Sequence, residues 1–283
     1  MSDPDLTVVI PSRNGADILR EFLPAILAET RRARGELILV DDCSADSTAE
    51  LITREYPSVR LLRREGEPAF CRAVNLGMAK ADSGRLLLLN NDTVPEEGSF
   101  TALLEELSNA PEETAAAVPS IPRPDGTDDG DFRWAFVRGL AVTGEGIAGQ
   151  PYPSGACALW KRDVWEELGG LDTRYAPIYW EDTDLGVRMR RAGYGMIRCP
   201  RITVAHHHAS TMGAGGSSRR LRERNRFIFM DSNCSSRRER LATALWLPLH
   251  SLKARLSGNR AFTEGYRDYR EWKELRGGTS ARR

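Results

Sequence analysis

Two apolar runs in this sequence are followed by amide and carboxylate side chains. Leu86–Leu89 is followed by Asn90-Asn91-Asp92-Thr93, and Leu37–Val40 is followed by Asp41-Asp42. A continuously hydrophobic run of this length predicts a strand that is buried on both faces. In open α/β sheets, ligands bind beyond the carboxyl ends of the strands. The two runs therefore predict a ligand site at one edge of a sheet, and carboxylates at that edge favour a divalent metal.

The alternative is that each aspartate only caps the helix or turn that follows it. For either pair alone this explanation is as good as the functional one, but together the two pairs favour a site. A third acidic group, Glu181-Asp182-Thr183-Asp184, opens a predicted helix. Mutual repulsion should raise the pKa of at least one of these carboxylates, as a general base near neutral pH requires. Acids are also favoured in any first helical turn, and spacing alone narrowly favours that explanation.

Three adjacent histidines, His206-His207-His208, follow a short predicted strand. If the strand continues, residues 206 and 208 lie on one face, so one histidine could bind a metal beside Asp92. The spacing does not match a zinc site. The chain has no G-x-G-x-x-G after its first strand and no G-x-x-x-x-G-K-[ST], which argues against dinucleotide and P-loop chemistry.

The first half of the chain alternates between predicted strands and helices. Hydrophobic patterns predict strands at 6–10, 37–40, 59–62 and 85–89 with helices between them, the last over 71–81. Pro11 should end the first strand, and Pro24 should kink or shorten the first helix. This order predicts an α/β fold with a mostly parallel sheet that is covered on both faces.

The second half is less regular. Prolines and glycines between residues 119 and 153 predict a long loop without regular elements. We expect a strand at 155–160, helices at 162–168 and 182–192, and two short strands at 196–199 and 202–205. Residues 211–218 predict a mobile loop or linker, and the chain beyond them should be helical to its end.

The overall composition places few limits on function. The chain has 283 residues and a formal net charge of zero, but residues from Ser217 onward carry a net charge of +10 and the rest −10. Five scattered cysteines without a C-x-x-C pair indicate reduced thiols and a cytoplasmic protein. We expect no signal peptide, because the N-terminus is polar and acidic, and no membrane-spanning helix.

The basic C-terminal part contains a leucine stripe at helical spacing, flanked by arginines. The leucines are Leu241, Leu245, Leu249, Leu252 and Leu256. Such a helix over 236–260 can lie on an anionic membrane at its inner face. The interpretation we favour from sequence is that the stripe packs on the body of the protein or on another subunit, which leaves a homo-oligomer open. Nucleic-acid binding is a weaker third option, because no recognised module accompanies the charge, and we expect none.

Taken together, these motifs resemble those of the inverting nucleotide-sugar glycosyltransferases of family 2, which have the A-type fold. The resemblance covers roughly residues 6–230. It rests on Val8–Asn14, Val40–Thr48, Ala73–Gly77, Leu88–Thr93, Gly169–Asp172, Trp180–Leu185 and Val204–His206, in that order along the chain. Asn90-Asn91-Asp92 is especially common in members that transfer rhamnose or similar sugars.

The resemblance implies a role for each matching residue. Asp182 would deprotonate the acceptor hydroxyl, and Asp92 with His206 would bind Mn²⁺ or Mg²⁺ at the donor diphosphate. Asp42 would bind the pyrimidine base of a UDP- or dTDP-sugar. The remaining substrate-binding positions that it implies are Pro11, Ser12, Arg13, Asn14, Asp41, Asn75, Asn90, Asn91, Trp180 and Glu181. In-line attack would invert the anomeric carbon.

Two departures from the family pattern are notable. Position 90 is an amide where many relatives have the first carboxylate of Asp-x-Asp, and Ala69-Phe70-Cys71 replaces a common Gly-Phe-Ala. A nucleotidyltransferase and a non-catalytic, glycan-binding relative remain alternatives. We expect a catalytic domain over 1–216, with a donor part to about 118 and an acceptor part from about 119, followed by a helical basic extension over 217–283. The acceptor would be a glycan, a lipid-linked sugar or a small molecule.

Overall fold

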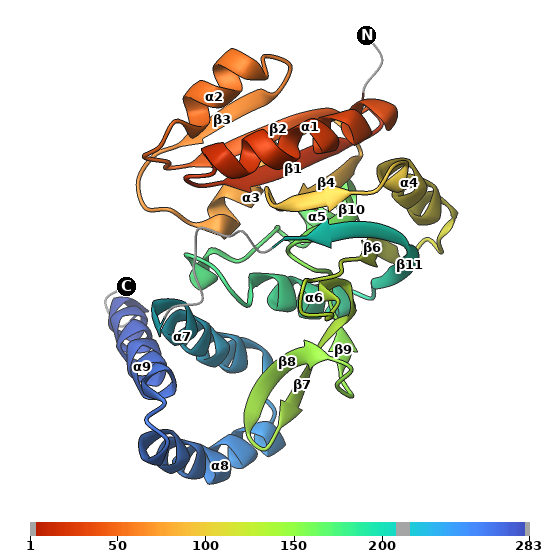
Figure 1. The fold of residues 1–283 in the computed structure, drawn as a ribbon. Coiled ribbons are helices and arrows are strands. Elements are labelled where there is room, and N and C mark those ends of the chain that lie inside the picture. The colour runs from red at the N-terminus through yellow and green to blue at the C-terminus, as the bar shows by residue number, and fades with distance from the viewer. Residues whose placement is uncertain (1–3, 208–215, 281–283) are drawn as a thin grey trace.

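The computed structural model describes residues 4–207 and 216–280 and is built around one large mixed sheet (Figure 1). Its strand order is β3-β2-β1-β4-β10-β6-β11-β5. Strands β1 to β4 are parallel, whereas β10 runs antiparallel to β4 and β6. The strands are β1 (Thr7–Ser12), β2 (Glu36–Asp42), β3 (Arg60–Arg64), β4 (Arg85–Leu89), β5 (Thr93–Pro95), β6 (Thr114–Ser120), β10 (Cys157–Lys161) and β11 (Gly195–His206). The predicted α/β sheet is confirmed.

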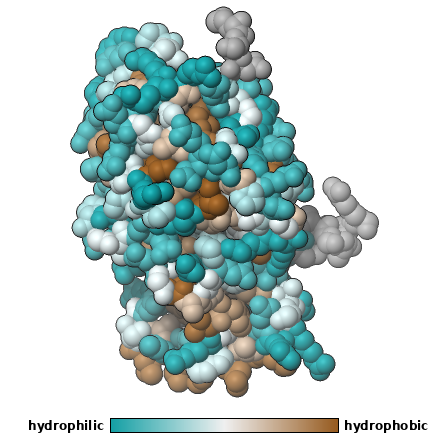
Figure 2. Space-filling view, turned by 90° about the vertical axis from the view of Figure 1, so that its right-hand side faces the viewer, coloured by the Kyte–Doolittle hydropathy of each residue, from teal (hydrophilic) through white to brown (hydrophobic). Residues whose placement is uncertain are grey.

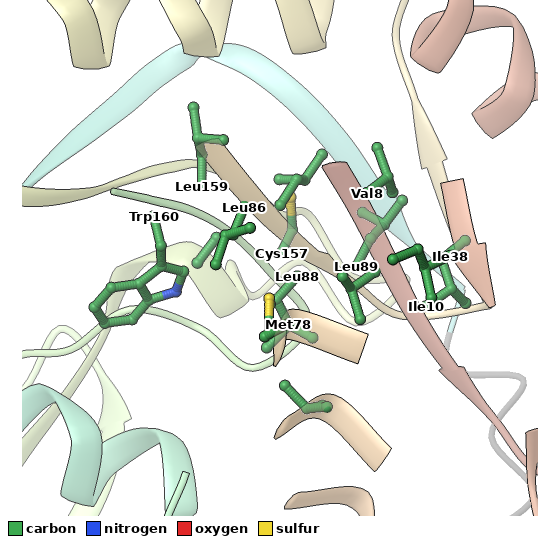
Figure 3. Packing of buried hydrophobic residues seen from close by; sticks show 14 of the residues in the cluster. Val8, Ile10, Ile38, Met78, Leu86, Leu88, Leu89, Cys157, Leu159 and Trp160 are labelled. Atoms are coloured by element: carbon green, nitrogen blue, oxygen red, sulfur yellow. The ribbon is translucent and has the colours of Figure 1, made fainter. Parts of the chain in front are cut away.

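The core of this sheet explains why its strands read as unbroken apolar runs. Side chains of β1, β2, β4 and β10 pack together with Met78 below them (Figure 3). Leu86, Leu87 and Leu89 are fully buried, so both faces of β4 are covered. The helices around the sheet are α1 (Ala16–Arg32), α2 (Thr48–Glu55), α3 (Phe70–Ala79), α4 (Ser99–Asn109), α5 (Arg162–Glu167) and α6 (Glu181–Arg191).

Pro11 does not end the first strand, and Pro24 does not shorten the first helix. Strand β1 continues through Pro11 to Ser12, and helix α1 continues through Pro24 for another eight residues, to Arg32. Pro24 removes one helical hydrogen bond, but Leu19, Leu23 and Ile26 on the apolar face of α1 are completely buried. This tertiary packing outweighs the local penalty of the proline.

The loop expected between residues 119 and 153 is also wrong in part, because it contains a second, three-stranded sheet. Its strands are β7 (Phe132–Val137), β8 (Leu140–Glu145) and β9 (Gln150–Pro151), in the order β8-β7-β9. The β7–β8 hairpin turns at Arg138 and Gly139, with φ of 48° and 76°. Two successive left-handed residues are typical of the two-residue type I′ turn of β-hairpins. Arg-Gly predicts this turn only weakly, because Asn-Gly and Asp-Gly are the preferred pairs.

The two short strands expected at 196–199 and 202–205 form one strand, β11. The register of β11 against β6 shifts between Cys199 and Thr203, in the stretch that contains Pro200. Strand β11 ends at His206, beside β5, and this pairing brings the histidine next to the segment after β4.

The last part of the chain is helical, as expected, and contains α7 (Gly216–Asn233), α8 (Arg237–Leu256) and α9 (Arg260–Ser280). The predicted loop at 211–218 falls largely on residues 208–215, outside the described part of the chain. Helix α7 packs along α9, and its aromatic residues join β7, β8 and α6 in a second apolar core. Within the two described ranges, no helix has an apolar stretch long enough to cross a bilayer.

Candidate active site

The acidic residues predicted at the strand ends lie at one edge of the large sheet. Ser12 at the end of β1 is in register with Asp41 of β2, and its hydroxyl accepts a hydrogen bond from Asn91 Nδ2 at 2.8 Å. The Asn90 N–H donates to the carbonyl of Ala156 at 2.9 Å, just before β10. The segments after β1, β2 and β4 are therefore held together at this edge.

Asp42 is held in place by two donors. It forms an ion pair with Arg64 of β3, and its Oδ2 accepts a hydrogen bond from the Ala69 N–H at 2.8 Å. Both side chains of the pair are nearly buried, at 10% and 8% exposure. A carboxylate has about four acceptor sites, so the one at position 42 can accept a further donor from a ligand.

The turn after β1 is joined to the turn after β2. Asn14 donates its backbone N–H to Ser44 Oγ at 2.9 Å and accepts from the Ala45 N–H at 2.7 Å. Asp41 Oδ1 accepts from the Ser44 N–H at 3.0 Å. Pro11 is buried in β1, whereas Arg13 is exposed beside this paired rim.

A buried carboxylate–imidazole–carboxylate chain lies at the end of β11. His206 Nε2 is 3.1 Å from Asp92 Oδ1, and His206 Nδ1 is 2.8 Å from Asp129 Oδ2. Burial disfavours the charged imidazolium, but the hydrogen bonds and charges of Asp129 and Asp92 outweigh it and raise the pKa of His206 to about 9. Asn90 Nδ2 lies 3.4 Å from His206 Nε2.

This raised pKa has a measurable effect on stability in metal-free protein. Because the folded pKa exceeds the unfolded value of 6.5, the stabilisation is fully present below pH 6.5 and is lost as the pH rises through 9. We expect the free energy of unfolding to fall by roughly 2–3 kcal/mol over this interval. Urea titrations in EDTA should show the fall in the wild type and not in His206→Gln. An identical pH dependence in both proteins would contradict it.

Asp182 lies in the first turn of α6, facing Gly155. Its Oδ2 accepts from the Gly155 N–H at 3.3 Å, and its Oδ1 accepts from the Thr183 N–H at 2.6 Å. Burial raises the pKa of Asp182, these backbone donors oppose the shift, and the charge of Asp129 adds to it. The adjacent Ala156 binds Asn90, so Asp182 lies close to the segment that carries Asp92.

The two acids beside Asp182, Asp184 and Glu181, differ in their hydrogen bonding. Asp184 is buried and accepts from Tyr175 Oη, Asn233 Nδ2 and Arg188 Nε at 2.7 to 3.0 Å, so it joins α6 to its neighbours. Glu181 is buried, and its Oε2 has no hydrogen-bond partner among the described residues. Burial, and then the charge of Asp182, raises the pKa of Glu181. The expected repulsion therefore exists, but burial is the larger cause.

Helix α7 positions the start of α6. Tyr179 and Trp180 both have left-handed backbones, with φ of 84° and 76°, a conformation that is strained for side chains of this size. Asn225 of α7 is fully buried, and its Nδ2 donates to the carbonyls of Tyr175 and Ile178 at 2.6 and 2.9 Å. The extension thus holds the segment that presents Asp182.

Two of the predicted binding residues use their side chains within the protein. Asn75 forms two hydrogen bonds with the main chain of Leu171, at 2.8 and 2.9 Å. Trp180 is buried in the second core and donates its indole N–H to the Arg222 carbonyl. Asp129 and Asn225 were not predicted from sequence. Asp129 lies in the region 119–153 that was expected to be a loop, and Asn225 lies in the C-terminal extension.

The sequence and the fold of this chain both match known proteins. The mannosyltransferase PcManGT from Pyrobaculum calidifontis, in complex with GDP-Man and Mn²⁺, matches with a TM-score of 0.59 and 19% identity, over 98% of this chain and 85% of that one. A family model described as "Glycosyltransferase like family 2" matches residues 4–229. The predicted A-type fold is confirmed.

Curated relatives agree with this assignment. The N-acetylglucosaminyl-diphospho-decaprenol L-rhamnosyltransferase of Mycobacterium tuberculosis is 30% identical, over 75% of this chain and 79% of the relative. The O-antigen chain rhamnosyltransferase WbaN of Salmonella anatum is 27% identical, over 74% and 68%. The fold and these relatives define a nucleotide-sugar glycosyltransferase. The chain belongs to glycosyltransferase family 2, which confirms the prediction of a glycosyltransferase.

Proposed function

We propose that this protein is a metal-dependent, inverting rhamnosyltransferase that uses a UDP- or dTDP-sugar and a glycan or lipid-linked acceptor. The observation that carries the proposal is the chain Asp92–His206–Asp129 at the strand ends, together with Asp182, whose pKa the charge of Asp129 helps to raise. Both curated relatives named above are rhamnosyltransferases, which supports the choice of sugar.

The residues around His206 fit a divalent cation. Asp92 and His206 offer a carboxylate oxygen and an imidazole nitrogen, which suit Mn²⁺ and, through the oxygen, Mg²⁺. Asp129 orients the imidazole from its other nitrogen, an arrangement typical of metal-binding histidines. Among the described residues, no group of three His, Cys, Asp or Glu could hold a metal by itself. The remaining ligands would therefore come from the donor diphosphate and water. A bound cation would neutralise charge on the leaving diphosphate.

The donor would lie along the strand ends. Asp42 accepts the N–H of the pyrimidine base, while Asp41 and the turn Pro11–Asn14 line the nucleotide. Asn90 and Asn91 contact the sugar and phosphates. Asp182 takes the proton of the acceptor hydroxyl as that oxygen bonds to the anomeric carbon and the bond to the diphosphate breaks. Attack from the face opposite the leaving group inverts the anomeric centre.

Asp182 has the properties that this role requires. Its raised pKa makes it a stronger base than an ordinary aspartate, and the Gly155 and Thr183 N–H groups fix its orientation. A Cβ added at Gly155 would lie 3.4 Å from Asp182 Oδ2, which is an ordinary van der Waals contact. Activity should therefore fall as the solution is acidified, and the fall should occur at a pH above the usual pKa of an aspartate.

A thermal-shift screen tests the donor assignment. We expect UDP, dTDP or the corresponding rhamnose donor to raise the melting temperature only when Mn²⁺ is present, because binding to the folded state stabilises by RT ln(1 + [L]/Kd). Nucleoside triphosphates and GDP serve as comparison ligands. Stabilisation by triphosphates alone, or equal stabilisation in EDTA, would overturn the proposal.

Asp129→Ala should weaken the binding of Mn²⁺ without preventing folding. The substitution removes the acceptor of His206 Nδ1, so the imidazole loses its fixed orientation. Loss of such an orienting partner typically costs 10- to 100-fold in metal affinity. Calorimetric titration of Mn²⁺ in the presence of UDP measures the effect, and Asp131→Ala, at the other end of the short 3₁₀ helix Asp129–Asp131, is the control. Unchanged affinity in Asp129→Ala would contradict the orienting role.

A further inference from the structure

The face of α8 that carries the leucine stripe is exposed. Leu241, Leu245, Leu249, Leu252 and Leu256 have relative exposures of 64, 69, 53, 55 and 81%. Figure 2 shows hydrophobic side chains gathered along the lower end of the molecule, where Figure 1 places α8. Of the two arrangements favoured from sequence, packing of the stripe on the body of this chain is therefore wrong, and packing on another subunit stays a prediction.

The opposite face of α8 is fixed to the body. Thr243 Oγ1 donates to the Gly139 carbonyl at 3.1 Å, His250 Nε2 lies 2.8 Å from the Arg138 carbonyl, and Ala254 is buried. Gly139 is required for this approach, since an added Cβ would lie 2.7 Å from the Ala242 carbonyl oxygen. The helix cannot rotate to bury its leucines without breaking these contacts.

The side chains beside the leucine stripe are mostly basic, which favours an anionic partner. Residues 236–260 contain six basic side chains and one acid, Glu239. That acid is already engaged in the capping box with Ser236. By helical periodicity, Arg237 and Arg255 lie along one side of the leucines and Lys253 lies along the other, and all three are exposed. Two copies joined through this stripe would bring like charges together.

We propose that α8 docks this enzyme onto the surface of an anionic lipid bilayer. The leucines insert between the lipid headgroups, and the flanking arginines and lysine contact the phosphates. The stripe from Leu241 to Leu256 is about 22 Å long, enough for the helix to lie flat in the interface. Figure 1 places α8 at the end of the molecule away from β2 and β3, so docking leaves the donor-binding edge accessible.

Vesicle sedimentation with the full chain tests the proposal. We expect binding to vesicles that contain phosphatidylglycerol, weak binding to pure phosphatidylcholine, and a decrease as NaCl is raised. The triple variant Leu245→Gln, Leu249→Gln, Leu252→Gln should bind at least about tenfold more weakly. Glutamine is a good helix former, so α8 should persist.

Three controls keep the outcome interpretable. Leu275→Gln changes a leucine of α9 that is 77% exposed, and it should bind like the wild type. Melting temperature and the Mn²⁺-dependent shift with nucleotide should be unchanged in the triple variant, which separates docking from the proposed function. Wild-type protein that stays in the supernatant with anionic vesicles would overturn the proposal. A wild-type dimer that the triple variant converts to monomer would overturn it too, because a second copy would then cover the stripe.

Discussion

Replacing Asp182 by asparagine should lower kcat by roughly 10²- to 10⁴-fold, the usual contribution of a positioned general base. The amide has the same shape, and its single carbonyl oxygen can keep the shorter hydrogen bond, from the Thr183 N–H, while the longer one from the Gly155 N–H is lost, so the start of α6 should be largely preserved. The donor contacts other side chains, and its affinity should change little. Release of nucleoside diphosphate with saturating donor and acceptor measures kcat, and calorimetry measures donor affinity.

The matched control for this substitution is Asp17→Asn on α1, whose side chain is 99% exposed. It also exchanges one carboxylate for an amide and should keep wild-type turnover. The acidic fall in activity should disappear from the residual activity of Asp182→Asn. A variant at position 182 that retains more than about a tenth of wild-type kcat would contradict the role of general base.

Replacing Asp92 by asparagine should weaken Mn²⁺-dependent nucleotide binding by roughly 100-fold or more, because the cation loses its carboxylate ligand and several kcal/mol of charge stabilisation. Asp92 is buried beside His206, and asparagine fills the same volume. The pKa of His206 should fall, because one of its two carboxylate neighbours loses its charge. Titration of UDP and dTDP, with and without Mn²⁺, gives the affinities.

Asp82→Asn is the control for position 92, since its side chain is 63% exposed and pairs with Arg60 at the surface. Affinity in EDTA should be equally weak in wild type, Asp92→Asn and Asp82→Asn. If Asp92→Asn kept the full effect of Mn²⁺, the cation would have to bind elsewhere, and the diphosphate would have no assigned site.

The donor half of the protein was predictable from sequence because its signals are strong and local. Buried parallel strands appear as unbroken apolar runs, and the acids that follow them must lie at their ends. For this reason Asp42 and Asp92 could be placed at one edge before the structure was known. The short alternation β-α-β also leaves few possible topologies.

The acceptor half was less predictable, because its structure is determined by contacts between residues that are far apart in the sequence. Asp129 follows a run of prolines and glycines, and only the fold brings it to His206, 77 residues away. Asn225 donates to the carbonyl of the left-handed residue Tyr179, 46 residues before it. The leucine pattern of α8 indicates an amphipathic helix, but only the packing of Gly139 against it shows which face points outward.

The most direct measurement is the position of Mn²⁺ in crystals grown with a nucleoside diphosphate, found from its anomalous scattering. We expect one strong peak within coordination distance of Asp92 and His206, with the diphosphate between this ion and the carboxylate at position 182. A peak at any other place, or a nucleotide bound away from Asp42, would contradict it.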